Sequence, residues 1–237
     1  MSLLQNTLWK TRNATLPVVL RGYDAVVANA VSPFLWRCPP STHVSQYKRL
    51  VRGQHLEVGP GSAYYLIESG AARLARKLTL VDLAEEPLAY AKQRLRARGA
   101  LDCETFACDV RKPLPFAPPD PFDSCAANHV LHCVPGPMAQ KLDLALAQLT
   151  RVLADDAVFF GSTVLQETDE GHTAASRTFV RWLNDRGIFY NDRDCLGAID
   201  SILKDHFRAV SVRRVGAEAV FEAHAPLRRA SSSSSSR

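Results

Sequence analysis

The sequence predicts an α/β fold in which a mostly parallel sheet carries helices on both faces. Short apolar runs alternate with longer segments of helical period from residue 54 to about residue 207. Two further apolar runs, at 209–213 and 217–223, then follow one another directly. Such alternation is typical of parallel sheets, because each crossover between neighbouring strands lays a helix against one face.

The expected elements follow in a regular order. The clearest helix is 138–153, in which leucines recur on one face at helical spacing. A proline-rich loop at 113–121 separates the third strand from the fourth. The expected strands are 55–58, 78–81, 103–107, 122–127, 157–165, 209–213 and 217–223, and the expected helices are 63–76, 86–98, 138–153, 177–186 and 195–207.

The chain of 237 residues is long enough for one large α/β domain. We expect residues 1–53 to form an N-terminal extension or lid, partly helical, in which prolines stop any long helix. Residues 54–224 then form the ligand-binding domain. Residues 225–237, which include a serine run, are expected to be a disordered tail.

Composition and charge favour an ordinary globular protein. Hydrophobic residues make up 46% and charged residues 22% of the chain, which allows a sizeable core. The net charge of +5 is modest, and the arginines lie on helical stretches without interleaved aromatic residues. This pattern favours a solvated helix surface over a nucleic-acid face.

Cysteine spacing and hydropathy bear on location and partners. None of the six cysteines forms a CxxC pair, so we expect reduced thiols and no metal site. The sequence has no apolar leader and no apolar run of membrane-spanning length. We therefore expect a cytoplasmic monomer or homodimer with no nucleic-acid or membrane partner.

A glycine turn follows the first expected strand. The segment 57–63 reads Glu-Val-Gly-Pro-Gly-Ser-Ala and opens the first helix. Glycines let the backbone turn sharply and approach a ligand closely. Asp82 ends the second strand, where an acid accepts the hydroxyls of a ribose in Rossmann-like sites. The turn and the acid together predict a nucleoside cofactor.

Three residues narrow the kind of nucleoside. A dinucleotide fingerprint needs a small residue at its sixth position, where this chain has Tyr64. The carboxylate of Glu57 repels a pyrophosphate but suits a cation, such as the amino group and sulfonium of S-adenosylmethionine. Asp109 follows the third strand, so acids at three successive strand ends point into one crevice.

These motifs resemble those of the class I S-adenosylmethionine-dependent methyltransferases. The resemblance covers roughly residues 20–224 and is carried by the segments 57–63, 81–82, 108–110 and 122–133. It implies a Rossmann-like, seven-stranded, mostly parallel sheet with helices on both faces and an antiparallel last strand. It also implies transfer of a methyl group from S-adenosyl-L-methionine to an O, N, S or C atom of an acceptor.

The resemblance also implies where the cofactor lies. It places the glycines against the methionine part, the second-strand acid on the ribose, and the third-strand segment at the adenine. Ala63 stands where the family usually has a third glycine, and we expect no loss of binding because alanine is small. The expected cofactor-binding residues are Glu57, Gly59, Gly61, Asp82, Leu83, Asp109, Val110 and Asn128.

A narrower resemblance concerns the acceptor. Tyr23-Asp24, the segment 36–39 and the segment 128–133 resemble small-molecule methyltransferases of microbial secondary metabolism. The acceptor is therefore expected to be a small molecule. Asn128 is not followed by the Pro-Pro-Tyr of enzymes that methylate amino groups of nucleic acids, which argues against a DNA base.

Two histidines follow the fourth strand. A histidine with the ordinary pKa near neutrality can serve as a general base, so His129 and His132 are both candidates, and His132 is slightly favoured. The alternative for either is that it packs in the loop or caps the next helix. The candidate substrate-binding residues are aromatic or cationic, and simple packing or a surface ion pair is an equal alternative for them. They are Tyr23, Trp36, Arg37, Tyr47 and Trp182.

Other activities fit the same residues less well. A non-methylating relative that uses the bound cofactor in a cyclisation or rearrangement would have the same cofactor site. An NAD(P)-type oxidoreductase is disfavoured by Tyr64 and Glu57, and an RNA or protein methyltransferase by the absence of a basic stripe leading into the crevice.

Overall fold

A computed structural model describes residues 27–100 and 103–228, with side chains from residue 31 onward. Its seven strands form one sheet in the order β3-β2-β1-β4-β5-β7-β6. Of these strands β7 alone runs opposite to its neighbours, which confirms the predicted α/β fold with an antiparallel last strand. The strands are β1 (Gln54–Val58), β2 (Lys77–Asp82), β3 (Cys103–Ala107), β4 (Phe122–Asn128), β5 (Leu153–Val164), β6 (Phe207–Val215) and β7 (Glu218–Pro226).

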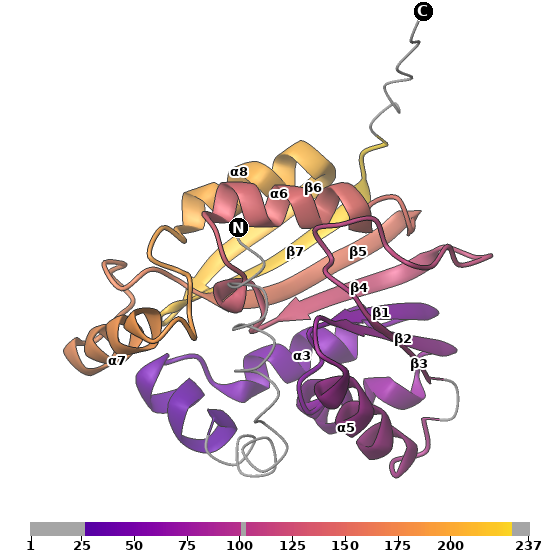
Figure 1. Cartoon of the computed structure of the whole chain (residues 1–237), viewed down its shortest axis with the longest axis horizontal. Helices are drawn as coiled ribbons and strands as arrows, with labels where there is room; N and C mark the ends of the chain where they lie inside the picture. Colours follow the sequence, from indigo (N-terminus) through magenta and orange to yellow (C-terminus); the bar gives the residue numbers. More distant parts are fainter. Residues whose placement is uncertain (1–26, 101–102, 229–237) are drawn as a thin grey trace, which may run out of the picture.

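Helices cover both faces of the sheet. Figure 1 shows α6 and α8 on one face and α3 and α5 on the other. The α-helices are α3 (Pro40–Leu50), α4 (Tyr64–Glu68), α5 (Glu85–Arg96), α6 (Met138–Leu149), α7 (Ala174–Asp185) and α8 (Leu196–His206). The segment η1 (Val27–Leu35) is a π-helix, and η2 (Ala71–Arg73) and η3 (Leu131–Cys133) are single turns of 3-10 helix.

The core lies in two layers, one on each face of the sheet. Phe159 packs in the layer under α6 and α8, with Leu146 and Leu203. The next residue, Phe160, packs in the layer on the other face, with Leu80. Successive side chains of a strand point to opposite faces, so a continuous apolar run is what a strand buried on both sides requires.

The first expected helix is shorter than predicted. The periodic segment 63–76 forms two pieces, α4 and η2, because Gly70 between them takes a left-handed conformation with φ +73°. A glycine adopts this conformation at little steric cost, so the helix ends there and the chain turns toward β2.

The described part of the N-terminal extension belongs to the core. Helix α3 begins directly after Pro39, with Pro40 in its first turn, where a missing N–H costs nothing. Its buried face includes Gln46, whose side-chain amide donates to the carbonyl of Phe221 on β7. Helix α3 is therefore part of the same packed unit as the sheet.

The C-terminal strand is longer than expected. β7 continues to Pro226, so residues 225 and 226, which the sequence assigned to the tail, lie in the sheet. The N–H of Leu227 then donates to the carbonyl of His206. Residues 229–237 of the predicted tail lie outside the described residues. None of the helices in the described ranges has the length and apolar content that a bilayer crossing needs.

Candidate cofactor and acceptor site

One cavity opens at the carboxyl ends of β1, β2, β3 and β4. Because these strands are parallel neighbours, their carboxyl ends meet at a single edge of the sheet. The structure brings all the expected cofactor-binding residues to the wall of this cavity: Glu57, Gly59, Gly61, Asp82, Leu83, Asp109, Val110 and Asn128.

The glycine turn needs its glycines for two different reasons. Gly59 has φ +64°, and a Cβ there would lie 2.5 Å from a methyl carbon of Val130. Gly61 has φ +52°, and a Cβ there would meet no atom within 4 Å. The first glycine thus permits close packing of the turn on the segment after β4, and the second leaves open space beside the backbone.

Ala63 takes the conformation of a glycine. It is buried, and its φ of +59° places it in the left-handed region as the residue before α4. This geometry gives a physical reason for the third glycine that the family usually has at this position, because an L side chain pays a steric cost there.

Glu57 is buried and held by two other side chains. The Tyr47 hydroxyl donates to one carboxylate oxygen over 2.5 Å, and Nε2 of His55 lies 2.9 Å from the other. His55 is fixed in turn by the Ser124 hydroxyl, 2.9 Å from its Nδ1. The carboxylate at the end of β1 therefore has a defined orientation at the cavity.

Asp82 faces the same cavity from the end of β2. Burial raises the pKa of its carboxyl from 3.8 to about 6, although backbone N–H groups of Ala84 and Leu83 oppose the shift. The Ala84 N–H lies 3.0 Å from Oδ1. A half-buried carboxylate with remaining acceptor capacity fits a ligand that brings hydroxyl donors, such as a ribose.

Asp109 is clamped by an arginine that the sequence analysis did not single out. Arg111 makes a two-point contact, with Nη2 2.8 Å from Oδ2 and Nε 2.9 Å from Oδ1. Burial would raise the pKa of Asp109, but the hydrogen bonds and charge of Arg111 outweigh it and the pKa is lowered. Arg111 also donates to the carbonyl of Pro135, so it ties two walls of the cavity together.

Asn128 carries the clearest mark of a ligand site. Both atoms of its side-chain amide are buried, and neither makes a hydrogen bond of ordinary geometry within the described residues. Buried polar groups normally have hydrogen-bond partners, so an amide without one at a cavity wall fits a polar group of a ligand. With the acids and the open turn at Gly61, these residues fit the amino-acid and ribose groups of S-adenosylmethionine.

The two candidate histidines occupy different places. His129 lines the cavity, and its Nδ1 lies 3.4 Å from the Tyr65 hydroxyl. His132 is buried and is not among the residues that line the cavity. Its Nδ1 accepts the N–H of Val164 over 3.2 Å, and its ring packs on Phe189. Burial holds the pKa of His132 well below its usual value, so the ring is neutral.

The expected substrate-binding residues are spread out. Tyr47 lines the cavity, with its hydroxyl engaged by Glu57. Trp36 is buried and stacks on Phe179, away from the cavity wall, and Arg37 is exposed. Trp182 is 43% exposed on α7, with the Arg186 guanidinium over its ring. Tyr23 lies outside the described residues.

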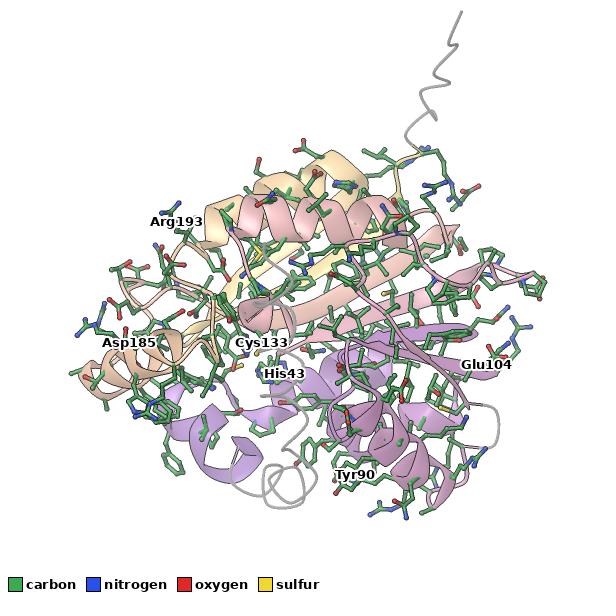
Figure 2. All side chains as sticks on the ribbon, viewed as in Figure 1. His43, Tyr90, Glu104, Cys133, Asp185 and Arg193 are labelled. Atoms are coloured by element: carbon green, nitrogen blue, oxygen red, sulfur yellow. The ribbon has the colours of Figure 1, made fainter. Side chains whose placement is uncertain are left out.

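A buried acid lies in contact with the ring of His129. Glu218, the first residue of β7, has a carboxylate oxygen 3.0 Å from Nε2 of His129 and 3.2 Å from Nε2 of His43. His43 lies near the middle of the molecule, where α3 meets the sheet (Figure 2). The sequence analysis missed Glu218 and His43, because neither forms a local motif with the glycine turn or with the fourth strand.

The fold and the cavity define a class of protein. A mostly parallel sheet with a reversed last strand places a glycine turn, strand-end acids and an unsatisfied amide around one opening. This is a Rossmann-like protein that binds a nucleoside at the carboxyl edge of its sheet.

Comparisons with known proteins identify the family. A family model described as a methyltransferase domain matches residues 56–161. The "Physcion biosynthesis cluster O-methyltransferase" of Aspergillus chevalieri is 36% identical over 213 residues, which cover 89% of this chain and 92% of that protein. The "Demethylluteothin O-methyltransferase" of Streptomyces thioluteus is 31% identical over 201 residues, which cover 85% of each chain.

Solved structures agree on the fold. N-methyltransferase NodS from Bradyrhizobium japonicum, in complex with S-adenosyl-L-homocysteine, superposes with a TM-score of 0.54 at 17% identity, over 78% of this chain and 85% of that one. The DhpI-SAM-HEP complex gives 0.59 at 16% identity, over 94% and 98%. The chain belongs to the S-adenosylmethionine-dependent methyltransferases, and S-adenosylmethionine is its methyl donor.

Proposed function

We propose that this methyltransferase acts on a hydroxyl group of a small molecule in secondary metabolism, and that His129 is its general base. The observation that carries the proposal is the place of His129, which lines the cofactor cavity directly after Asn128. The two relatives reported above span most of the chain and are both named O-methyltransferases, which supports the acceptor class.

The cofactor side follows from the cavity wall. We assign Glu57, Gly59, Gly61 and Asn128 to the methionine end, which carries an amino group and a carboxylate. Asp82 and its neighbour Leu83 take the ribose, and Asp109 with Val110 take the adenine. Bound S-adenosylmethionine supplies a methyl group on a positively charged sulfur, so the protein has only to orient the acceptor and handle its proton.

The acceptor side needs a group that removes a proton. A neutral hydroxyl is a weak nucleophile, and a base that takes its proton as the new bond forms contributes typically about 100- to 10,000-fold. His129 lines the cavity, whereas His132 does not line it and its Nδ1 accepts the N–H of Val164. We therefore favour His129 as the base and assign His132 to the packing of the loop.

We propose a peripheral role for the remaining aromatic residues. Trp36, Phe179 and Trp182 stack in series, with ring centroids 5.8 Å apart in each pair. Such a stack forms a rigid wall along α7. Arg37 next to this wall is available to an acidic group of the acceptor.

The test uses the full chain with S-adenosylmethionine carrying a trideuterated methyl group. The protein is incubated with separate pools of phenols, enols, carboxylic acids and amines, and products are analysed by mass spectrometry. We expect label on hydroxyl acceptors. Label only on amines or carboxylates would refute the acceptor class, and an isomerised product without label would indicate the non-methylating alternative.

A further inference from the structure

Glu218 joins two histidines from distant parts of the chain. It is 0% exposed, and it sits at the turn between β6 and β7, paired with Val215 on one side and Val164 on the other. Its carboxylate approaches His129 after β4 and His43 on α3. The cofactor assignment leaves this fully buried acid without a role.

We propose that Glu218 is the positioning residue of the acid–base site: it accepts the Nε2–H of His129 and so leaves the Nδ1 lone pair facing the acceptor. The inference rests on the proposed role of His129. It adds a second residue, a defined tautomer and a charge partner to that role.

The two ring nitrogens of His129 have opposite surroundings. Nε2 lies 3.0 Å from the buried carboxylate, a contact without ordinary hydrogen-bond geometry, and Nδ1 lies 3.4 Å from the hydroxyl of Tyr65, which also lines the cavity. The backbone of His129 is left-handed, with φ +54°, a conformation that is sterically unfavourable for a residue with a side chain. A strained conformation that directs one nitrogen to an acid and the other to a cavity is typical of functional sites.

Glu218 is ionised although it is fully buried. Burial would raise the pKa of this carboxyl, but the nearby imidazoles of His129 and His43 outweigh burial and the pKa is lowered. The carboxylate is therefore ionised at 0% exposure, where an uncompensated charge is costly. When His129 takes a proton from the acceptor, the pair becomes neutral overall, so Glu218 stabilises the imidazolium that the reaction forms.

The other titratable neighbours do not compete for this role. Burial lowers the pKa of His43, although the charge of Glu218 opposes the shift. Burial and the charge of Glu218 raise the pKa of Cys38, so its thiol, 3.5 Å from Nε2 of His43, stays protonated. His132 is neutral, and Arg213 on β6 contributes a positive charge that disfavours protonation of His43.

The first test needs no acceptor. The full chain is labelled with 15N in its histidine rings, and ring-nitrogen NMR spectra are recorded with and without S-adenosylhomocysteine, with His129→Asn to assign the signals. We expect neutral His129 to carry its proton on Nε2. A proton on Nδ1 would overturn the proposal, whether or not a hydroxyl acceptor has been found.

The second test uses Glu218→Gln, with Glu222→Gln as a matched control on the same strand, because Glu222 pairs with Arg49 at the surface. We expect Glu218→Gln to lower kcat, to leave the KM for S-adenosylmethionine unchanged, and to move the acid limb of the kcat profile about 1–3 pH units lower. An unmoved acid limb would overturn the proposal.

A third outcome would replace the proposal. Cys38, His43 and Glu218 each offer a ligand atom, and these atoms lie within 4.8 Å of one another. If metal analysis of the purified chain gave one equivalent of a transition metal that Glu218→Gln and His43→Gln both lose, then Glu218 would be a metal ligand. We expect no stoichiometric metal, because burial keeps the Cys38 thiol protonated and a metal binds the thiolate.

Discussion

The hydroxyl of Tyr47 donates a 2.5 Å hydrogen bond to the carboxylate of Glu57, so a helix that precedes the sheet fixes the acid at the end of β1. Helix α3, which lies in the segment that the sequence analysis expected to be an extension or lid, thus supports one wall of the cavity. Both residues also line the cavity, so removing this hydrogen bond would show how far ligand binding there depends on α3.

Tyr47→Phe should weaken the binding of S-adenosylhomocysteine, because it removes the donor and leaves a buried carboxylate oxygen without its partner. Losing one partner of a buried hydrogen bond costs about 1–3 kcal/mol, so we also expect a lower midpoint of thermal unfolding. Calorimetric titration and a melting curve measure the two effects. Tyr90→Phe on the outer part of α5 is the control and should change neither.

Asp82→Asn should separate stability from binding. In the protein without ligand the pKa of Asp82 is raised from 3.8 to about 6, so its carboxyl contributes stability that is lost as the pH rises between these two values. At pH 7 the ionised group is a net cost, and we expect the Asn variant to unfold at a higher temperature. Its affinity for S-adenosylhomocysteine should fall at least 10-fold, because the ribose loses a charged acceptor, and a calorimetric titration at pH 7 checks this.

The same shift predicts how pH affects binding by the unaltered protein. As the pH falls through about 6, Asp82 takes up a proton and loses acceptor strength, so the affinity for S-adenosylhomocysteine should decrease. A series of titrations from pH 8 to pH 5 measures this, and the Asn variant should show a flatter dependence. Equal slopes for the two proteins would assign the effect to another group.

Ala63→Gly should stabilise the protein. The left-handed conformation of Ala63 costs about 1–2 kcal/mol, part of which the greater freedom of glycine in the unfolded chain offsets. We expect a net gain below about 1 kcal/mol, seen as a higher midpoint in urea. Ala91→Gly in the middle of α5 is the matched control and should destabilise by about 1 kcal/mol or more. A loss of stability in both variants would contradict the strain at Ala63.

His129→Asn and His132→Asn should differ in what they change. The first should lower turnover about 100-fold or more at unchanged affinity for S-adenosylhomocysteine, because it removes the proposed base. The second should mainly lower stability, since His132 is buried against Phe189 and accepts the N–H of Val164. Steady-state rates and melting curves for both variants decide between the two histidines, and a large turnover effect confined to His132→Asn would reverse our assignment.

Local sequence was enough to bring the expected cofactor-binding residues to one cavity. Glu57 lies one residue before the end of β1, Asp82 and Asn128 end their strands, and Asp109 follows one, so their convergence follows from the parallel order of β1 to β4 alone. The sequence reasoning was wrong about the length of the first helix, which a single glycine ends. Gly70 divides the helix expected at 63–76, and helical periodicity does not reveal the conformation of one backbone residue.

The proposed acid–base cluster was beyond local reasoning. His43, His129 and Glu218 come from α3, the end of β4 and the start of β7, and they meet because β7 inserts between β5 and β6. The choice between His129 and His132 likewise depends on a left-handed residue followed by the short helical turn η3. Spacing alone places both histidines in the same loop and cannot orient them.

The position of Glu218 has a consequence for the order in which the enzyme matures. During synthesis, β1 to β4 and the glycine turn leave the ribosome well before the β6–β7 hairpin does. A nascent chain can therefore assemble its nucleoside pocket early, yet its proposed proton acceptor stays without a counter-charge until that hairpin docks. The chain would then be able to bind S-adenosylmethionine before it is able to catalyse methyl transfer, and docking of the β6–β7 hairpin would be the last folding step that activity requires.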